Sequence, residues 1–363
     1  MKRIFQHLDL YACYGTQMGV NMNIAIVGCG MIAPVHAKSI ELLSGHQLVA
    51  VADCIYSRAE TMAAEYGAKA YATSSVDDLE TMLKEEDIQV LHICTPHYLH
   101  VSMASMALKR GIHVFMEKPP IINWKQWDML KEVVEEQKEK ATLGICFQNR
   151  FNPGIELIRN KLKNSELGNI LAARGIVTWC RDEDYYSGGD WRGKWNTEGG
   201  GVLINQSIHT LDLLQYLVDK KPLSMEANMA NHHLKGVIEV EDTMEAYVTY
   251  PEDVRVCFYA TNGYKGNVPP LIELECEKAR VRIEELEVTA FYTDGEVERW
   301  TVPRGEQLGK SYWGAGHTDC IHSFYKSLES QTPFQIQLKD IEHTIWLMLT
   351  AYDTAGRGNV YHV

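Results

Sequence analysis

The sequence lacks several features that would each place a protein in a distinct class. No stretch approaches the roughly 18 consecutive apolar residues that a membrane-spanning helix needs. The nine cysteines are scattered singly, without the C-x-x-C pairs of a structural zinc site. Positive charge is also scarce, because 35 Lys and Arg stand against 48 Asp and Glu, a net charge of −13. We therefore expect no membrane partner, no disulfide framework, no metal site and no nucleic-acid partner, since a phosphate-binding surface needs excess positive charge.

The composition that remains is that of an ordinary globular protein. The chain has 363 residues, of which 45% are hydrophobic and 23% charged. At roughly 150 residues per domain, this length predicts about two domains. Unpaired cysteines favour a reducing cytoplasm. Polar residues interrupt residues 1–21 where a signal peptide would be apolar, so we expect a weakly packed N-terminal extension there.

The pattern of expected elements divides the chain near residue 148. Between residues 22 and 148, strand-like and helix-like stretches alternate, which predicts an α/β Rossmann domain with a doubly wound parallel sheet. From 149 to 363 we expect a helix over Val202–Val218, then successive alternating strands and two closing helices. This order predicts an α+β domain on a mostly antiparallel open sheet. The strand Met244–Tyr250 offers large side chains on both faces, so we also expect a homodimer or homotetramer formed through this domain.

A glycine-rich turn follows the first expected strand. It reads Gly28-Cys29-Gly30-Met31-Ile32-Ala33, the G-x-G-x-x-A pattern of a dinucleotide-binding turn. The two glycines permit a tight turn and a close approach to a pyrophosphate, and Ala33 permits close helix packing. Asp53 stands 20 residues beyond Ala33, where a carboxylate accepts the ribose hydroxyls and repels a 2′-phosphate. The sequence therefore predicts NAD rather than NADP, although Asp53 could instead cap a helix.

Three further segments carry a family resemblance. They are Cys94-Thr95-Pro96-His97-Tyr98-Leu99-His100, Glu117-Lys118-Pro119-Pro120, and the stretch from Trp191-Arg192 through three glycines to Asn205, His209 and Asp212. In this order they resemble the glucose–fructose oxidoreductase / inositol dehydrogenase / MocA (Gfo/Idh/MocA) family, from about residue 22 to the end of the chain. The resemblance implies that the nicotinamide lies against the open sheet of the second domain.

The resemblance also implies individual roles. Lys118 is expected at the reacting carbon of the substrate, and His209 at the reacting hydroxyl. The residues expected to line the cofactor, besides the glycine turn and Asp53, are Thr95, Pro96, His97, His100, Glu117, Lys118, Trp191 and Arg192.

Physical reasoning supports some of these roles and leaves others open. Lys118 follows the carboxyl end of a strand, where open parallel sheets bind ligands, but it could also be a surface cation paired with Glu117. Asn205, His209 and Asp212 have the spacing of one helix face, which could equally be a solvated face. Many family members carry Asp where this chain has Asn205, so His209 lacks an orienting carboxylate and is a weaker candidate for the base.

The expected substrate is a sugar-like small molecule. Its expected contacts are Lys118, Arg150, Tyr185, Asn205, His209 and His317, with the loop aromatics Tyr312 and Trp313 offering flat faces. Arg150 could instead form an interdomain salt bridge. These features predict an NAD-dependent oxidoreductase acting on a secondary alcohol of a sugar, glycoside or cyclitol. Two alternatives are a glycosidase of the same fold that retains its NAD, and a non-catalytic regulator that binds dinucleotide.

Overall fold

The N-terminal domain is built on a six-stranded sheet. The computed structural model describes residues 21–73, 76–302 and 316–356. All six strands are parallel, in the order β3-β2-β1-β4-β5-β6. They are β1 (Met22–Val27), β2 (His46–Asp53), β3 (Lys69–Ala72), β4 (Val90–Ile93), β5 (His113–Glu117) and β6 (Leu143–Cys146). Because the order reverses between β1 and β4, the carboxyl ends of these two strands form the crevice where such sheets bind ligands.

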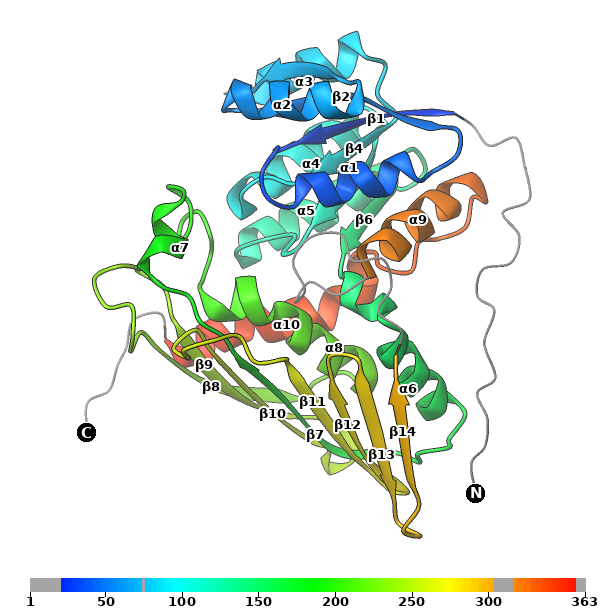
Figure 1. Ribbon diagram of the computed structural model, residues 1–363, viewed down its shortest axis with the longest axis vertical. Helices are drawn as coiled ribbons and strands as arrows, with labels where there is room; N and C mark the ends of the chain where they lie inside the picture. Colours follow the sequence, from blue (N-terminus) through cyan, green and yellow to red (C-terminus); the bar gives the residue numbers. More distant parts are fainter. Residues whose placement is uncertain (1–20, 74–75, 303–315, 357–363) are drawn as a thin grey trace.

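Helices cover both faces of this sheet, as expected for a doubly wound domain (Figure 1). They are α1 (Ala33–Glu41), α2 (Tyr56–Tyr66), α3 (Val76–Glu85), α4 (His100–Lys109) and α5 (Trp124–Gln137). The central strands β1 and β4 are mostly apolar because both faces are covered, with Asn23 in β1 and His92 in β4 as the polar exceptions. Ile24, Ile26 and Val90, for example, are completely buried.

The second domain contains an eight-stranded sheet in the order β14-β13-β12-β11-β7-β10-β9-β8. Only the β7–β10 pair is parallel. The strands are β7 (Ile170–Thr178), β8 (Ser224–Ala230), β9 (Thr243–Thr249), β10 (Arg255–Thr261), β11 (Leu271–Cys276), β12 (Ala279–Glu284), β13 (Glu287–Tyr292) and β14 (Val297–Thr301). The expected fold class, a Rossmann domain followed by an α+β domain, is confirmed.

One face of this sheet packs on helices and faces the N-terminal domain (Figure 1). The helices on that side are α6 (Pro153–Lys163), α8 (Ile208–Val218) and α10 (Leu338–Ala355). Along β9, Met244, Ala246 and Val248 are buried against these helices, whereas Glu245 and Tyr247 lie on the exposed face. We expected large apolar or aromatic side chains on both faces of this strand. On the outer face of β9, Tyr247 is the only such side chain. Within the described residues, no helix covers the outer face.

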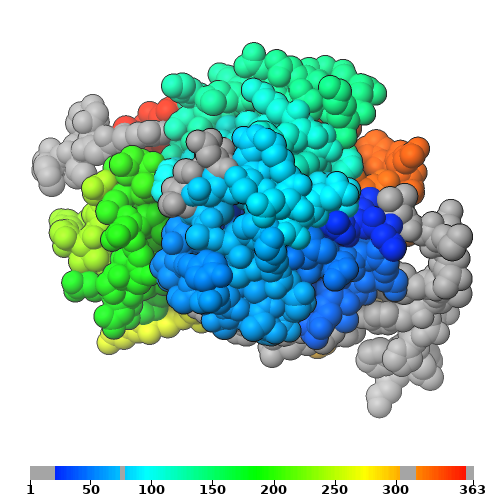
Figure 2. Space-filling model, turned by 90° about the horizontal axis from the view of Figure 1, so that it is seen from above, coloured from blue at the N-terminus to red at the C-terminus, as the bar shows by residue number. Residues whose placement is uncertain are grey.

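The helix α9 (Gly316–Glu329) returns to the N-terminal domain. Tyr325 of α9 reaches His92 of β4, with 2.8 Å between the hydroxyl and Nε2. His322 Nε2 lies 2.9 Å from the carbonyl oxygen of Ser39 in α1. In Figure 2 α9, in orange, accordingly lies beside the blue N-terminal segment. The alternation of expected elements gave no sign of this return. In the described part of the chain, no helix is both long enough and apolar enough to span a bilayer.

Candidate active site

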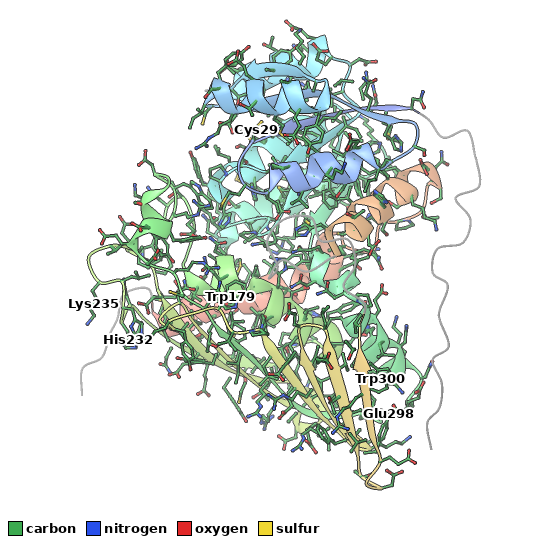
Figure 3. The ribbon with its side chains drawn as sticks, viewed as in Figure 1. Cys29, Trp179, His232, Lys235, Glu298 and Trp300 are labelled. Atoms are coloured by element: carbon green, nitrogen blue, oxygen red, sulfur yellow. The ribbon has the colours of Figure 1, made fainter. Side chains whose placement is uncertain are left out.

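The glycine turn after β1 has the shape that a dinucleotide requires. Gly28 has a φ of +89°, and a Cβ on it would lie 2.6 Å from the carbonyl oxygen of Cys94, so only glycine fits. A Cβ on Gly30 would meet no described atom within 4 Å, so this backbone faces open space. Cys29, labelled in Figure 3, lies between them, and Ala33 is fully buried where α1 meets the sheet. A pyrophosphate therefore fits against this turn and the start of α1.

Asp53 ends β2 beside the same turn. Its Oδ2 accepts a hydrogen bond from the backbone N–H of Cys29 at 2.7 Å, and its Oδ1 accepts from the N–H of Ile55 at 2.8 Å. The following helix α2 begins at Tyr56 with Ile55 as its N-cap residue and no side-chain cap, so Asp53 does not cap it. The carboxylate is thus held at the edge of the turn, in the position expected for a ribose contact.

The segment after β4 meets a loop of the second domain. The ring of His97 lies edge-on to Trp191 with 4.8 Å between centroids, and its Nδ1 lies 2.8 Å from the carbonyl oxygen of Glu198. The guanidinium of Arg192 stacks over the rings of Trp191 at 4.8 Å and Tyr185 at 5.0 Å. The loop carrying these residues, green in Figure 2, abuts the blue domain. The structure therefore brings the Trp191–Arg192 pair to the loop that contains Thr95 and Pro96.

Two of the expected cofactor residues face away from the crevice. His100 is completely buried, with Nδ1 2.8 Å from the carbonyl oxygen of Pro119 and Nε2 2.9 Å from that of Thr95. Glu117 turns inward, with Oε1 3.0 Å from His36 Nε2. We therefore correct the expectation that the side chain of His100 touches the cofactor, whereas a contact of Glu117 with the cofactor stays a prediction.

The contact between Glu117 and His36 is a buried ion pair. Burial disfavours the charged forms, but hydrogen bonds to Cys146 and Glu117 raise the pKa of His36 to about 9. Burial alone would raise the pKa of Glu117, yet the hydrogen bond and charge of His36 hold it well below its usual value. The side-chain N, O and S atoms of His36, Glu117 and Cys146 that could bind a metal lie within 4.8 Å of one another. Because these groups already interact with one another in the ion pair, we assign no metal to them.

Lys118 reaches from the end of β5 into the second domain. Its Nζ donates a hydrogen bond to the carbonyl oxygen of Asn205 at 3.1 Å, and the Lys118–Pro119 peptide is cis. Burial lowers the pKa of Lys118 from its usual value of 10.5, while the charges of Glu117, Cys146 and Glu198 oppose this shift. Since Glu117 pairs with His36, Lys118 is not the surface cation of the alternative interpretation.

The helix carrying Asn205 and His209 begins differently from the expectation. Residues Val202–Ser207 form a π-helical turn, η3, and the α-helix α8 begins only at Ile208. The side chain of Glu241 accepts from the N–H groups of Gly201 at 2.8 Å and Leu203 at 3.0 Å, which holds this turn. The expectation of one regular helix from Val202 is therefore wrong for its first turn.

His209 is a partly buried, neutral imidazole close to Lys118. Its Nε2 lies 3.3 Å from the side-chain amide nitrogen of Gln148, and its Nδ1 has no hydrogen-bond partner in the described part of the chain. Burial, followed by the charge of Lys118, holds the pKa of His209 well below its usual 6.5. Burial likewise lowers the pKa of His317 to about 4, although the charge of Glu117 opposes it. Lys118, His209 and His317 therefore form one electrostatically coupled group.

Arg150 is not open to a substrate. Its Nε and one terminal nitrogen donate to the two carboxylate oxygens of Asp212 at 2.8 and 2.6 Å, and that nitrogen also contacts the carbonyl oxygen of Asp340 at 3.1 Å. Both side chains are nearly inaccessible. Arg150 and Asp212 thus form a buried salt bridge between η2 (Gln148–Phe151) and α8. We remove Arg150 from the expected substrate contacts.

Other expected substrate residues cluster around Asn205. Its Nδ2 lies 3.5 Å from the hydroxyl of Tyr185 and donates to a carboxylate oxygen of Glu198. Glu198 was not singled out from the sequence, although it directly precedes the three glycines. Tyr312 and Trp313 lie outside the described residues.

Comparison with known proteins bears on these observations. Residues 22–145 match the model of an oxidoreductase family with an NAD-binding Rossmann fold, and residues 155–282 match a GFO/IDH/MocA C-terminal domain. The chain belongs to the Gfo/Idh/MocA family of oxidoreductases. Its N-terminal domain is accordingly an NAD-binding Rossmann domain, as the glycine turn predicted.

Individual relatives are distant. The chain is 26% identical over 216 residues to inositol 2-dehydrogenase of Rhizobium meliloti, covering 58% of this chain and 59% of the relative. It is 32% identical over 200 residues to D-glucoside 3-dehydrogenase of Escherichia coli, covering 54% of each. The matches thus span little more than half the length of these relatives.

A solved structure is similar in fold. It is the WlbA dehydrogenase from Bordetella pertussis in complex with NADH and UDP-GlcNAcA, with a TM-score of 0.77, 24% identity, and coverage of 92% of this chain and 96% of that one.

Proposed function

We propose that the protein is an NAD-dependent dehydrogenase that oxidises a secondary alcohol of a sugar, glycoside or cyclitol. The proposal rests on the contact between Lys118 and the η3–α8 segment, where Lys118 Nζ donates to the carbonyl oxygen of Asn205. There an amine with a lowered pKa and a neutral imidazole interact electrostatically, beside the dinucleotide-binding loops. An alcohol oxidation needs such a proton acceptor near neutral pH. The sugar-related names of the two curated relatives support the substrate class.

The residues around the crevice fit NAD. The backbone of Gly28, Gly30, Met31 and Ile32 would hold the pyrophosphate with the start of α1, and Asp53 would accept from the adenosine ribose. Thr95, Pro96, His97, Trp191 and Arg192 would line the nicotinamide half, since the structure brings them together where the two domains meet. When bound, NAD accepts the hydride that the carbinol carbon releases.

The side chains of this chain would manage the proton. Lys118 Nζ would take the hydroxyl proton as the C–H bond breaks, and the resulting ammonium is stabilised by its bond to the Asn205 carbonyl and by nearby carboxylates. Neutral His209 would accept a hydrogen bond from the same hydroxyl or donate one to it, orienting the alcohol. Tyr185, Asn205 and His317 would contact other hydroxyls of the substrate.

One experiment tests the proposal. A panel of sugars, cyclitols and glycosides is incubated with NAD and the purified protein, and NADH absorbance is followed. NADH accumulation with at least one panel member, abolished in Lys118→Met, would support a dehydrogenase. Glycoside cleavage without NADH accumulation would instead indicate the NAD-retaining glycosidase. NAD binding without turnover of any panel member would favour the regulator.

A further inference from the structure

A buried carboxylate adjoins Asn205 although the sequence has none at that position. Glu198 lies in the loop between α7 (Glu183–Ser187) and η3, and it is completely buried. One of its carboxylate oxygens accepts from the side-chain amide of Asn205, and the other accepts from the backbone N–H of Gly193. A buried carboxylate is costly unless it has such partners, so its placement beside the active site is a specific feature of this loop.

The contacts of Glu198 lead directly to the reacting group. Asn205 offers its side-chain amide to Glu198 and its backbone carbonyl to Lys118 Nζ, so one residue links the carboxylate to the amine. The carbonyl of Glu198 also accepts from His97 Nδ1 at 2.8 Å, which attaches the loop to the N-terminal domain. Glu198 thus links its own loop, through Gly193, to the η3 turn and to the segment that follows β4.

We propose that Glu198 is a positioning residue that supplies, through Asn205, the carboxylate missing from position 205. It fixes the Asn205 carbonyl that receives the Lys118 ammonium, and its negative charge stabilises that ammonium once the substrate proton has arrived. The inference rests on the proposed function, because it assigns Lys118 as the proton acceptor.

The electrostatic surroundings of Glu198 are consistent with this role. Burial raises its pKa to about 7, whereas the hydrogen bonds from Gly193 and Asn205 and the charge of Arg192 act to lower it. The other titratable groups that interact with it are Lys118 after β5, Glu241 before β9, Tyr186 of α7 and Tyr352 of α10. Lys118 and Arg192 are the cations in this set. Coupling to Lys118 is therefore direct and of the sign that raises the pKa of the amine.

Glu241 provides a matched control. It is also buried, its pKa is also raised to about 7 by burial, and it also binds backbone N–H groups beside the glycines. Its remaining hydrogen-bond partner is the hydroxyl of Tyr352, and it makes no contact with Asn205 among the described interactions. Glu241→Gln therefore imposes a similar structural disturbance without removing the carboxylate that Asn205 contacts.

The test measures the pKa of Lys118 without substrate or cofactor. The protein is labelled with trace acetic anhydride across a pH series, and acetylation of the Lys118 peptide is quantified by mass spectrometry against exposed Lys140. Glu198→Gln should lower the pKa of Lys118 by about half a unit to one unit, because a nearby negative charge is lost. Glu241→Gln should change it much less, because Glu241 contacts neither Asn205 nor Lys118 through its side chain in the described structure. An unchanged value in Glu198→Gln, or an equal fall in both variants, would overturn the proposal.

An exchange variant keeps the test decisive if Glu198→Gln folds poorly. In Glu198→Gln/Asn205→Asp, the amide and carboxylate trade places, so the hydrogen bond and the negative charge both return. This variant should recover the wild-type pKa of Lys118, and a folded exchange variant with a lowered pKa would contradict the proposal. With a substrate in hand, Glu198→Gln should lower kcat about ten-fold with little change in KM. If no member of the panel yielded NADH, the proposed function would fail, whereas the labelling result would stand separately.

Discussion

Replacing Lys118 by Met tests the proposed chemistry most directly. Methionine keeps an unbranched stem, so packing beside Pro119 should change little. The variant loses the hydrogen bond from Nζ to the Asn205 carbonyl at 3.1 Å and a positive charge. Leaving that carbonyl without its donor should cost about 1–3 kcal/mol of folding free energy, which a domain pair of this size tolerates.

The effect on rate should be far larger than the effect on stability. General base catalysis is typically worth about 10²–10⁴-fold, or about 3–5 kcal/mol of activation free energy. In the wild type the amine must be deprotonated to act, and burial lowers its pKa from 10.5, so activity should rise with pH through an ionisation below that value. Loss of the ammonium should also let the pKa of His209 rise, because the charge of Lys118 helps to hold it down. Residual activity should therefore follow a histidine ionisation instead.

Stopped-flow hydride transfer on Lys118→Met and His209→Ala, with a substrate from the panel, measures these effects. NAD dissociation constants and thermal unfolding serve as controls for binding and folding. His209→Ala should lose less rate than Lys118→Met, because no carboxylate of the described residues hydrogen-bonds to its imidazole to stabilise a positive charge. A larger loss in His209→Ala, with the wild-type pH profile surviving in Lys118→Met, would make His209 the main base. Near-normal transfer in both variants would refute the assignment of the site.

Three further predictions concern cofactor, stability and assembly. NAD should bind at least about ten-fold more tightly than NADP, since like charges at about 4 Å cost about 1–4 kcal/mol. In cofactor titrations, Asp53→Asn should reduce this difference in dissociation constants. Equal dissociation constants for the wild type would contradict a contact between Asp53 and the ribose. Asp212→Ala should lose about 3–5 kcal/mol in urea unfolding, because Arg150 is left buried without its carboxylate, whereas Glu41→Ala at the exposed Lys38–Glu41 pair should lose less than about 1 kcal/mol. Light scattering should give a dimer or tetramer, because Tyr247 and Tyr259 line a depression of about 380 Å³ on the outer sheet face; a mass near 41.2 kDa would contradict this.

Most of the fold follows from local patterns. The alternation of strand-like and helix-like stretches predicted the parallel sheet, and the run of successive alternating strands predicted the mostly antiparallel sheet. The turn Thr293-Asp294-Gly295 has the Asp-Gly pair typical of hairpins, and it joins β13 to β14, with Gly295 at a φ of +92°. Strand β14 itself was missed, because an exposed edge strand shows weak alternation.

The features missed by the sequence depend on distant contacts. The π-helical turn η3 is held by Glu241, which lies some 40 residues further along the chain from the turn it holds. The return of α9 depends on packing against α1 and on Tyr325 meeting His92. Glu198 could have been noticed as an acid directly before three glycines, but an acid in a glycine-rich loop is usually solvated. Burial, which makes it significant, is a property of the folded chain.

The corrected site residues share one physical cause. Motif position says that a residue is near a ligand site, but not which way its side chain points. Glu117 is the last residue of β5 and Lys118 is the first residue beyond it, and their side chains point to different partners. Glu117 turns toward His36 in the interior, and Lys118 toward Asn205 in the other domain. The carboxylates of Glu117 and Glu198 nevertheless act on Lys118 from opposite sides of the domain boundary, because their charges raise the pKa that burial lowers. The balance of burial against these two charges, rather than the motif alone, sets the proton affinity of the amine.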